Sequence, residues 1–118
     1  MTLDPRQRER EDGIRRLARS IDVSEDHLLS IWRTAEETRE HFRPDQVEEV
    51  ARHVLWHRGD FQNGYQPGQF TTTLMVLWDR ADSFNKARLA IAFPLMAHAI
   101  SLGKSGGDEL LKSWAGIA

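Results

Sequence analysis

Two histidines and a glutamate in the middle of the chain have the spacing of metal ligands. His53 and His57 are four residues apart, and Glu49 precedes His53 by another four, so one face of a helix would present all three side chains. Zinc accepts imidazole nitrogens together with a carboxylate. A catalytic HExxH site is not encoded, because Val54 rather than a glutamate follows His53. The spacing therefore predicts, as one alternative, a metal-dependent protein using these three residues, and solvated helical histidines are the simpler interpretation.

Residues 14–33 have the pattern of a helix-turn-helix, in which the second helix enters the major groove of DNA. Ala18 would lie where the two helices cross. In this alternative, which would act as a dimer, the residues near the phosphates are Arg15, Arg16, Arg19 and Arg33, and those near the base edges are His27 and Ser30. Asp22 stands where the motif usually has glycine, and Glu25 with Asp26 would place two carboxylates beside the phosphates. These departures disfavour nucleic acid, and an ordinary helical corner needs only the same apolar positions.

The sequence contains no arrangement that is typical of an enzyme. No serine occupies a nucleophile elbow, no glycine-rich loop has the spacing of a phosphate cradle, and the acidic residues form no catalytic pair. The chain also has no cysteine, which excludes disulfides, thiolate catalysis and cysteine-based zinc sites. We therefore expect a non-enzymatic protein and no cofactor.

An aromatic side chain outside the core stripe indicates a contact surface. On one expected helix Val47, Val50 and Val54 mark the buried side, and Trp56 points almost opposite to them. The following segment, residues 58–68, concentrates turn formers but also has aromatic anchors, which favours an ordered loop. We expect this loop to cover Trp56, with a second copy or another protein as the alternative covers. The predicted partner-binding residues are Trp56, Phe61, Tyr65 and Gln66.

Capping signals and apolar periodicity predict helices along most of the chain. The expected starts are Asp4-Pro5, Ser24, Pro44, Phe70, Asp82 or Ser83, and Asp108. In the first helix, residues 6–12 carry almost only charge, so this start should be solvated. In the fourth helix Phe70, Leu74, Leu77 and Trp78 have helical spacing and should form its buried side.

The segment from Phe84 to Leu102 should be the centre of the fold, because its apolar residues point to every side of the helical wheel. Pro94 should kink this helix or break it near Phe93, and Gly103 should end it. The expected fold is all-α: a compact bundle of five or six helices around a central proline-kinked helix, with one ordered loop in the middle of the chain.

Length and composition fit one folded domain spanning residues 1–118. The chain is 40% apolar and 29% charged, which is ordinary for a globular protein. The formal net charge of −2 gives no global attraction to nucleic acid or anionic lipid. Residues 1–12 are too charged for a signal peptide and can fray, and the longest apolar run, Leu89 to Leu102, is too short to cross a bilayer. We therefore expect a cytoplasmic protein without a membrane segment.

Several short motifs in the second half of the chain resemble a pattern found in small proteins of actinobacteria and their phages. They are Gly64-Tyr65-Gln66-Pro67-Gly68, Phe70-Thr71-Thr72, Arg80-Ala81-Asp82, Asn85, Arg88-Leu89 and Phe93-Pro94. The resemblance implies a shared fold and no particular activity. A phage or prophage origin would favour an accessory protein that binds and modulates a host protein, because so short a chain has little room for a full active site. This is our leading hypothesis, and a homodimer is compatible with it.

Overall fold

Seven α-helices and no strand occur between residues 4 and 117, the part of the chain that the computed structural model describes. The helices are α1 (Pro5–Ser20), α2 (Glu25–Arg39), α3 (Pro44–His57), α4 (Gln69–Arg80), α5 (Ser83–Ala92), α6 (Pro94–Gly106) and α7 (Asp108–Trp114). The side chains of Asp4, Ser24 and Asp82 accept backbone N–H groups at the starts of α1, α2 and α5, as their types predict. The all-α class is confirmed, with at least one helix more than expected.

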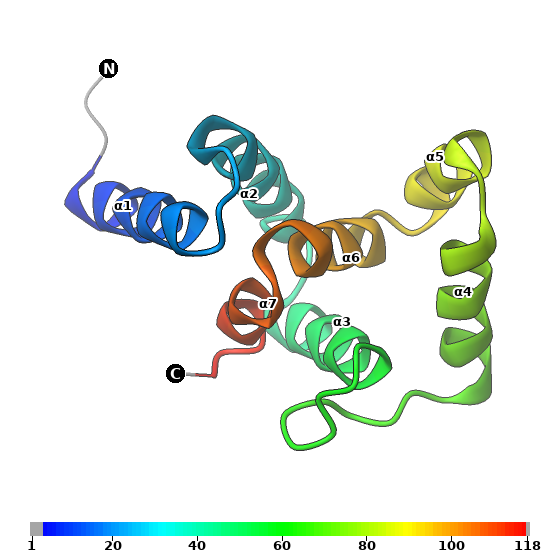
Figure 1. Ribbon diagram of the computed structural model, residues 1–118. Helices are drawn as coiled ribbons and strands as arrows, with labels where there is room; N and C mark the ends of the chain where they lie inside the picture. The colour runs from blue at the N-terminus through cyan, green and yellow to red at the C-terminus, as the bar shows by residue number, and fades with distance from the viewer. Residues whose placement is uncertain (1–3, 118) are drawn as a thin grey trace.

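Helix α6 lies at the centre of the molecule (Figure 1) and packs against α2, α3, α5 and α7. Its Ala99 and Leu102 are fully buried, and one cluster of buried side chains joins every helix except α5. The radius of gyration is 14.2 Å, against about 13.5 Å for a compact domain of this length. No helix within residues 4–117 combines the length and apolar character that a membrane span requires.

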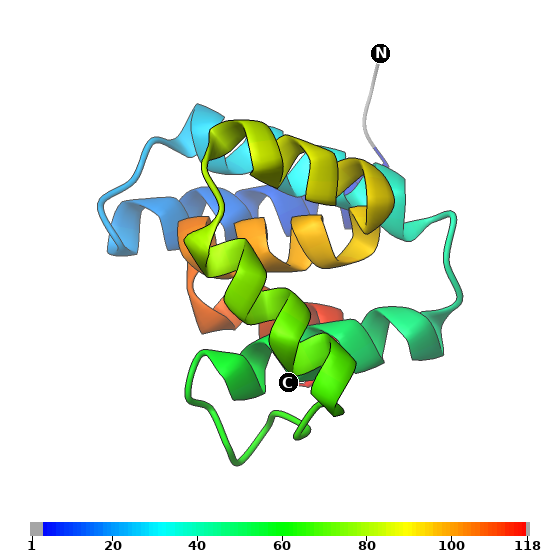
Figure 2. The same ribbon diagram turned by 90° about the vertical axis from the view of Figure 1, so that its right-hand side faces the viewer.

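The segment from Phe84 to Leu102 is broken near Phe93, which is one of the two outcomes expected at Pro94, and it is therefore not a single kinked helix. It consists of α5 and α6, which are separated at Phe93 and Pro94. Proline lacks the N–H that would continue α5 and suits the first turn of a new helix, so the chain turns there. Only α6 is central. Helix α5 has no buried residue and lies with α4 on the side of the molecule that faces the viewer in Figure 2.

Gly103 lies inside α6 and does not end it, contrary to the prediction. A Cβ atom at this position would be 2.9 Å from Leu111 Cδ1 and 3.0 Å from Arg58 Cδ. The glycine therefore provides space for α7 and for the end of α3 to approach α6 closely. The helix ends three residues later, before Gly107, whose φ of 70° suits glycine.

The charged first turns of α1 are helical from Pro5 onward, and one side chain in them is fully covered. Glu11 was expected among solvated residues but is only 2% exposed. It is buried because α1 crosses α2, which brings Arg33 over it. Of the twelve residues predicted to fray, 1–3 lie outside the described residues.

Candidate functional site

Residues 58–68 fold back onto α3 and are held there by hydrogen bonds. The Tyr65 N–H donates to the Arg52 carbonyl at 3.0 Å, and Arg52 Nη1 donates to the Asn63 carbonyl at 2.9 Å. The Asp60 carboxylate accepts both the side-chain amide and the backbone N–H of Asn63, each at 3.0 Å, and these bonds lower the pKa of Asp60. The segment is therefore bonded both to α3 and within itself.

Gly64 allows this loop to touch the helix. The residue is buried, and a Cβ atom would lie 2.4 Å from the Trp56 backbone nitrogen and 2.6 Å from the Asp60 carbonyl oxygen. Turn formers were predicted to concentrate in residues 58–68, where the usual reason for a glycine is its conformational freedom. Here the space that a side chain would occupy is the reason for glycine.

The predicted partner-binding residues gather around the loop. The Phe61 ring meets the Trp56 ring edge-on, with 4.7 Å between centroids, and thus forms the expected cover of Trp56. Trp56 remains half-buried, whereas Phe61 is 65% and Tyr65 48% exposed, and Gln66 is exposed as well. The loop therefore covers one aromatic side chain and displays two others.

Arg52 is the residue at this site that sequence reasoning missed. Its guanidinium lies 4.7 Å from the centroid of the Tyr65 ring, and its Nε pairs with Glu48 at 3.1 Å. Together with the bond to the Asn63 carbonyl, these contacts fix the loop to α3. In the sequence, the role of Arg52 could have been inferred from its position one helical turn before Trp56, on a helix that is followed by a short loop.

The three residues of the metal hypothesis do not form a common site. His57 Nε2 lies 2.7 Å from Asp79 Oδ2, an interaction that ties α3 to α4. His53 is half-buried, and this burial lowers its pKa although the charge of Glu49 opposes the shift. Among residues 4–117, no group of three or more histidine, aspartate or glutamate side chains could hold a metal ion. The described structure thus offers no assembled metal site at Glu49, His53 and His57.

Helices α1 and α2 form a corner with the outline that the helix-turn-helix alternative requires. Asp22 has a φ of 58°, in the left-handed region, at the position where the motif usually has glycine. The Val23 N–H donates to the Ala18 carbonyl at 3.0 Å, which closes α1 in a Schellman motif. The exposed residues on α2 include His27, Ser30 and Arg33.

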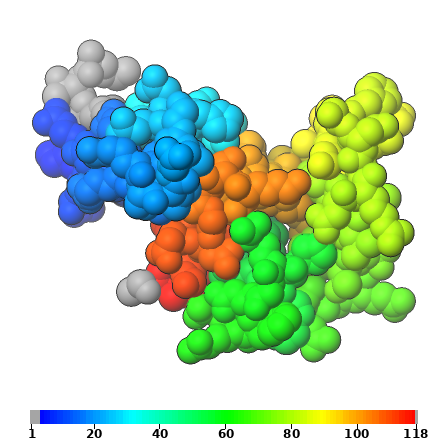
Figure 3. Space-filling model, in the orientation of Figure 1, coloured from blue at the N-terminus to red at the C-terminus, as the bar shows by residue number. Residues whose placement is uncertain are grey.

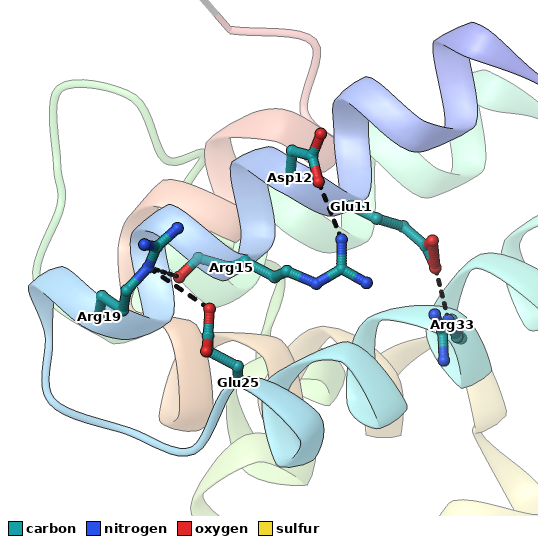
Figure 4. Close-up of polar contacts among 6 residues, drawn as sticks. All are labelled: Glu11, Asp12, Arg15, Arg19, Glu25 and Arg33. Atoms are coloured by element: carbon teal, nitrogen blue, oxygen red, sulfur yellow. Dashed lines mark hydrogen bonds and ion pairs between the residues drawn. The ribbon is translucent and has the colours of Figure 1, made fainter.

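Three of the four arginines proposed for phosphate contacts are paired with carboxylates of the same chain (Figure 4). The pairs are Arg15 with Asp12 at 2.9 Å, Arg19 with Glu25 at 3.4 Å, and Arg33 with Glu11 at 2.5 Å. Arg16 is exposed. DNA phosphates would have to compete with these carboxylates, so the local charge opposes the alternative.

A further exposed surface lies on α4 and α5, where the sequence predicted core. Phe70 and Leu77 were expected on the buried side of α4, but that side is formed by Leu74, Met75 and Trp78. The exposed apolar residues of the two helices are Phe70 (70%), Val76 (36%), Leu77 (53%), Phe84 (69%) and Ile91 (84%). The side of α4 that packs against α3 is rotated away from the predicted apolar stripe. Helix α5 packs against α6 on one side only.

Comparisons with known proteins do not assign this chain to a family. No family model matches the chain, and neither a curated protein nor a solved structure matches it. The function must therefore be inferred from the surfaces themselves.

The three predicted sets of residues differ in how the structure arranges them. The loop set lies together beside α3, His57 of the metal set is paired with Asp79, and three of the four arginines of the DNA set are paired with carboxylates. The loop set combines exposed aromatic side chains with an arginine below them, and these residue types are enriched at protein interfaces.

Proposed function

We propose that this protein is a non-enzymatic module that binds another protein through Trp56, Phe61, Tyr65 and Gln66, which we call the aromatic loop surface. The observation that carries the proposal is the display of two exposed aromatic side chains on a loop bonded to α3. Aromatic residues dominate the energetics of protein interfaces because they bury a large area at a small cost in side-chain entropy. Binding residues are also often found on loops that a rigid scaffold positions.

The contacts of the loop with α3 support the proposal independently of its composition. Tyr65 lies over the Arg52 guanidinium and Phe61 lies against Trp56, so neither ring has to be ordered when a partner arrives. An immobilised side chain costs about 0.5–1.5 kcal/mol on binding, and a preorganised surface avoids part of that cost. The loop therefore suits a specific contact better than a mobile segment of the same composition would.

The resemblance to small actinobacterial and phage proteins extends the proposal to the kind of partner. Residues 64–68, which carry the most distinctive part of that pattern, belong to the loop. A phage or prophage accessory protein acts by engaging a component of its host. The partner we propose is accordingly a host protein whose activity the module modulates.

The test is affinity capture from a host extract followed by direct binding to the captured protein. A Phe61→Ala/Tyr65→Ala variant should lose the partner, with a dissociation constant at least about 30-fold higher than that of the wild type. The matched control is Ile21→Ala, because Ile21 is a similarly exposed apolar residue at the α1–α2 corner. If the folded double variant captures the same proteins with the same affinity, the aromatic loop surface is not the binding site.

DNA binding by residues 14–33 is the second candidate. It is favoured by the left-handed turn at Asp22 and by the exposure of His27 and Ser30 on α2. Fluorescence anisotropy with a random duplex at low salt tests it. Binding that weakens steeply with added salt supports this candidate, and an unchanged signal up to high protein concentration eliminates it.

A further inference from the structure

Helix α5 is apolar on two opposite sides, and the chain covers only one of them. Leu89, Ala90 and Phe93 pack against the core. Phe84 and Ile91, seven residues apart and therefore on one stripe, lie on the opposite side and are among the most exposed apolar residues in the described structure. A helix of ten residues is marginal in water without tertiary packing, so a second cover for α5 would stabilise it.

Helix α4, which precedes α5 in the chain, also has exposed apolar residues, and we call the exposed apolar residues of the two helices together the α4–α5 face: Phe70, Val76, Leu77, Phe84 and Ile91. Figure 3 shows α4 and α5, in yellow-green and yellow, projecting from the body of the molecule. With about 150–250 Å² for a free aromatic side chain, the exposed fractions of Phe70 and Phe84 alone correspond to roughly 200–350 Å² of apolar surface, to which Val76, Leu77 and Ile91 add. Such a total is comparable to the largest patch on a typical monomer, about 300–600 Å², and supplies a substantial part of the roughly 800 Å² that each partner contributes to a stable interface.

A recess lies next to this region. It has a volume of about 310 Å³ and is lined at the junction of α5 and α6 by Ala92, Phe93 and Pro94, and on the side of α3 by Val50 and the charged Glu49. The recess begins next to Ile91 in the sequence, and the Phe70 ring lies 6.2 Å from the Phe93 ring at its edge. A twofold interface pairs one surface with itself, so it needs projections and recesses on the same face.

The charges around the face also favour a second copy over a polyanion or an anionic membrane. Between residues 69 and 93 the chain has three basic residues, Arg80, Lys86 and Arg88, and two acidic ones, Asp79 and Asp82. This mixture gives little net field for nucleic acid or lipid headgroups. Two copies of a surface with both signs can pair opposite charges at their rim.

We propose that two copies of this chain associate through the α4–α5 face in a twofold-symmetric dimer. The dimer covers the exposed stripe of α5 and places the rings of one protomer against the recess of its partner. The proposal is independent of the aromatic loop surface, which belongs to α3 and the loop that follows it.

Light scattering coupled to size-exclusion chromatography tests this, with loading concentrations from about 1 to 100 µM. The wild type should reach twice the 13.6 kDa of one chain. Phe84→Glu and Ile91→Glu should each raise the dimer dissociation constant by about 30-fold or more, because each buries a charge in the interface. Neither side chain is buried in the single chain, so both variants should keep the far-UV circular dichroism of the folded protein.

The matched control is Ile21→Glu, which places the same charge at an exposed apolar residue outside both the α4–α5 face and the aromatic loop surface and should leave the dimer intact. Hydrogen exchange gives a second measurement, in which the amides of α5 become slower to exchange as the concentration of wild type increases. A wild type that stays monomeric throughout overturns the proposal. So does a dimer that survives both charge substitutions, or a monomer that sediments with phosphatidylserine vesicles, which would assign the face to a membrane.

Discussion

Replacing Arg33 with methionine should destabilise the protein strongly at pH 7 and much less at pH 5.5. Glu11 Oε1 accepts a hydrogen bond from Arg33 Nε, whereas the buried Oε2 has no hydrogen-bond partner in the described structure. The bond from Arg33 lowers the pKa of Glu11, and burial opposes this shift. In Arg33→Met the effect of burial is opposed only by the charge of Arg15, while the charge of Asp12 acts in the same direction as burial. The carboxylate must then either stay charged without its hydrogen-bond partner or take up a proton.

Proton uptake by Glu11 sets the upper limit of the free energy of unfolding that Arg33→Met loses. Keeping a proton on a group whose unfolded pKa is about 4.3 costs about 3.7 kcal/mol at pH 7 and about 1.6 kcal/mol at pH 5.5. In the wild type, the lowered pKa of Glu11 contributes stability that is present above the unfolded pKa and is lost only as the pH falls through the folded pKa. Both pH values lie above that window, so the penalty of the variant should shrink by up to about 2 kcal/mol between pH 7 and pH 5.5.

Urea denaturation followed by tryptophan fluorescence at the two pH values measures this difference. Arg19→Met is the matched control, since it removes an exposed pair with Glu25 and should cost less than about 1 kcal/mol at either pH. Glu11→Gln keeps the shape and loses the charge, so its cost should be the same at pH 7 and pH 5.5. A penalty for Arg33→Met that does not change with pH, or that equals the penalty of the control, would refute this account of the pair.

Three further substitutions test other local features by the same denaturation assay. Gly64→Ala should cost about 1–3 kcal/mol, because its Cβ would overlap the Trp56 backbone, while Gly68→Ala, with open space around it, should cost little. Asp22→Gly should stabilise the protein by about 0.5–1 kcal/mol by relieving a left-handed φ of 58°. Burial lowers the pKa of His98, so the unfolded chain binds its proton first and stability should fall as the pH drops below about 6.5, less so in His98→Gln.

The features that were predicted correctly from the sequence depend on short-range chemistry. Asp4, Ser24 and Asp82 cap helices because an acceptor side chain satisfies N–H groups within one turn. Pro94 separates α5 from α6 because the ring removes a donor at that position. The cover of Trp56 by Phe61 follows from a short connection, since the loop begins only one residue after α3 ends and has little freedom to leave it.

The features that were missed depend on how distant segments meet. Glu11 and Arg33 are 22 residues apart, and the charged turns of α1 gave no reason to expect that one carboxylate would be covered. Gly64 and Gly103 were predicted to serve the backbone conformation, whereas both provide space for a neighbouring segment. The separation of His57 from a metal set depends on α4, which places Asp79 beside it.

Helical periodicity shows which side of a helix is apolar. It does not show whether the same chain or another molecule covers that side. The all-round apolar pattern from Phe84 onward predicted burial within the chain, and α6 fulfils this prediction while α5 exposes Phe84 and Ile91. A core and an interface between identical chains have the same pattern, because the same hydrophobic effect selects both. If the proposed dimer forms, the apolar residues of α5 are buried as predicted, but a second copy of the chain covers them. The charge substitutions on α5 decide between these two interpretations, since a monomer would leave the stripe without any cover.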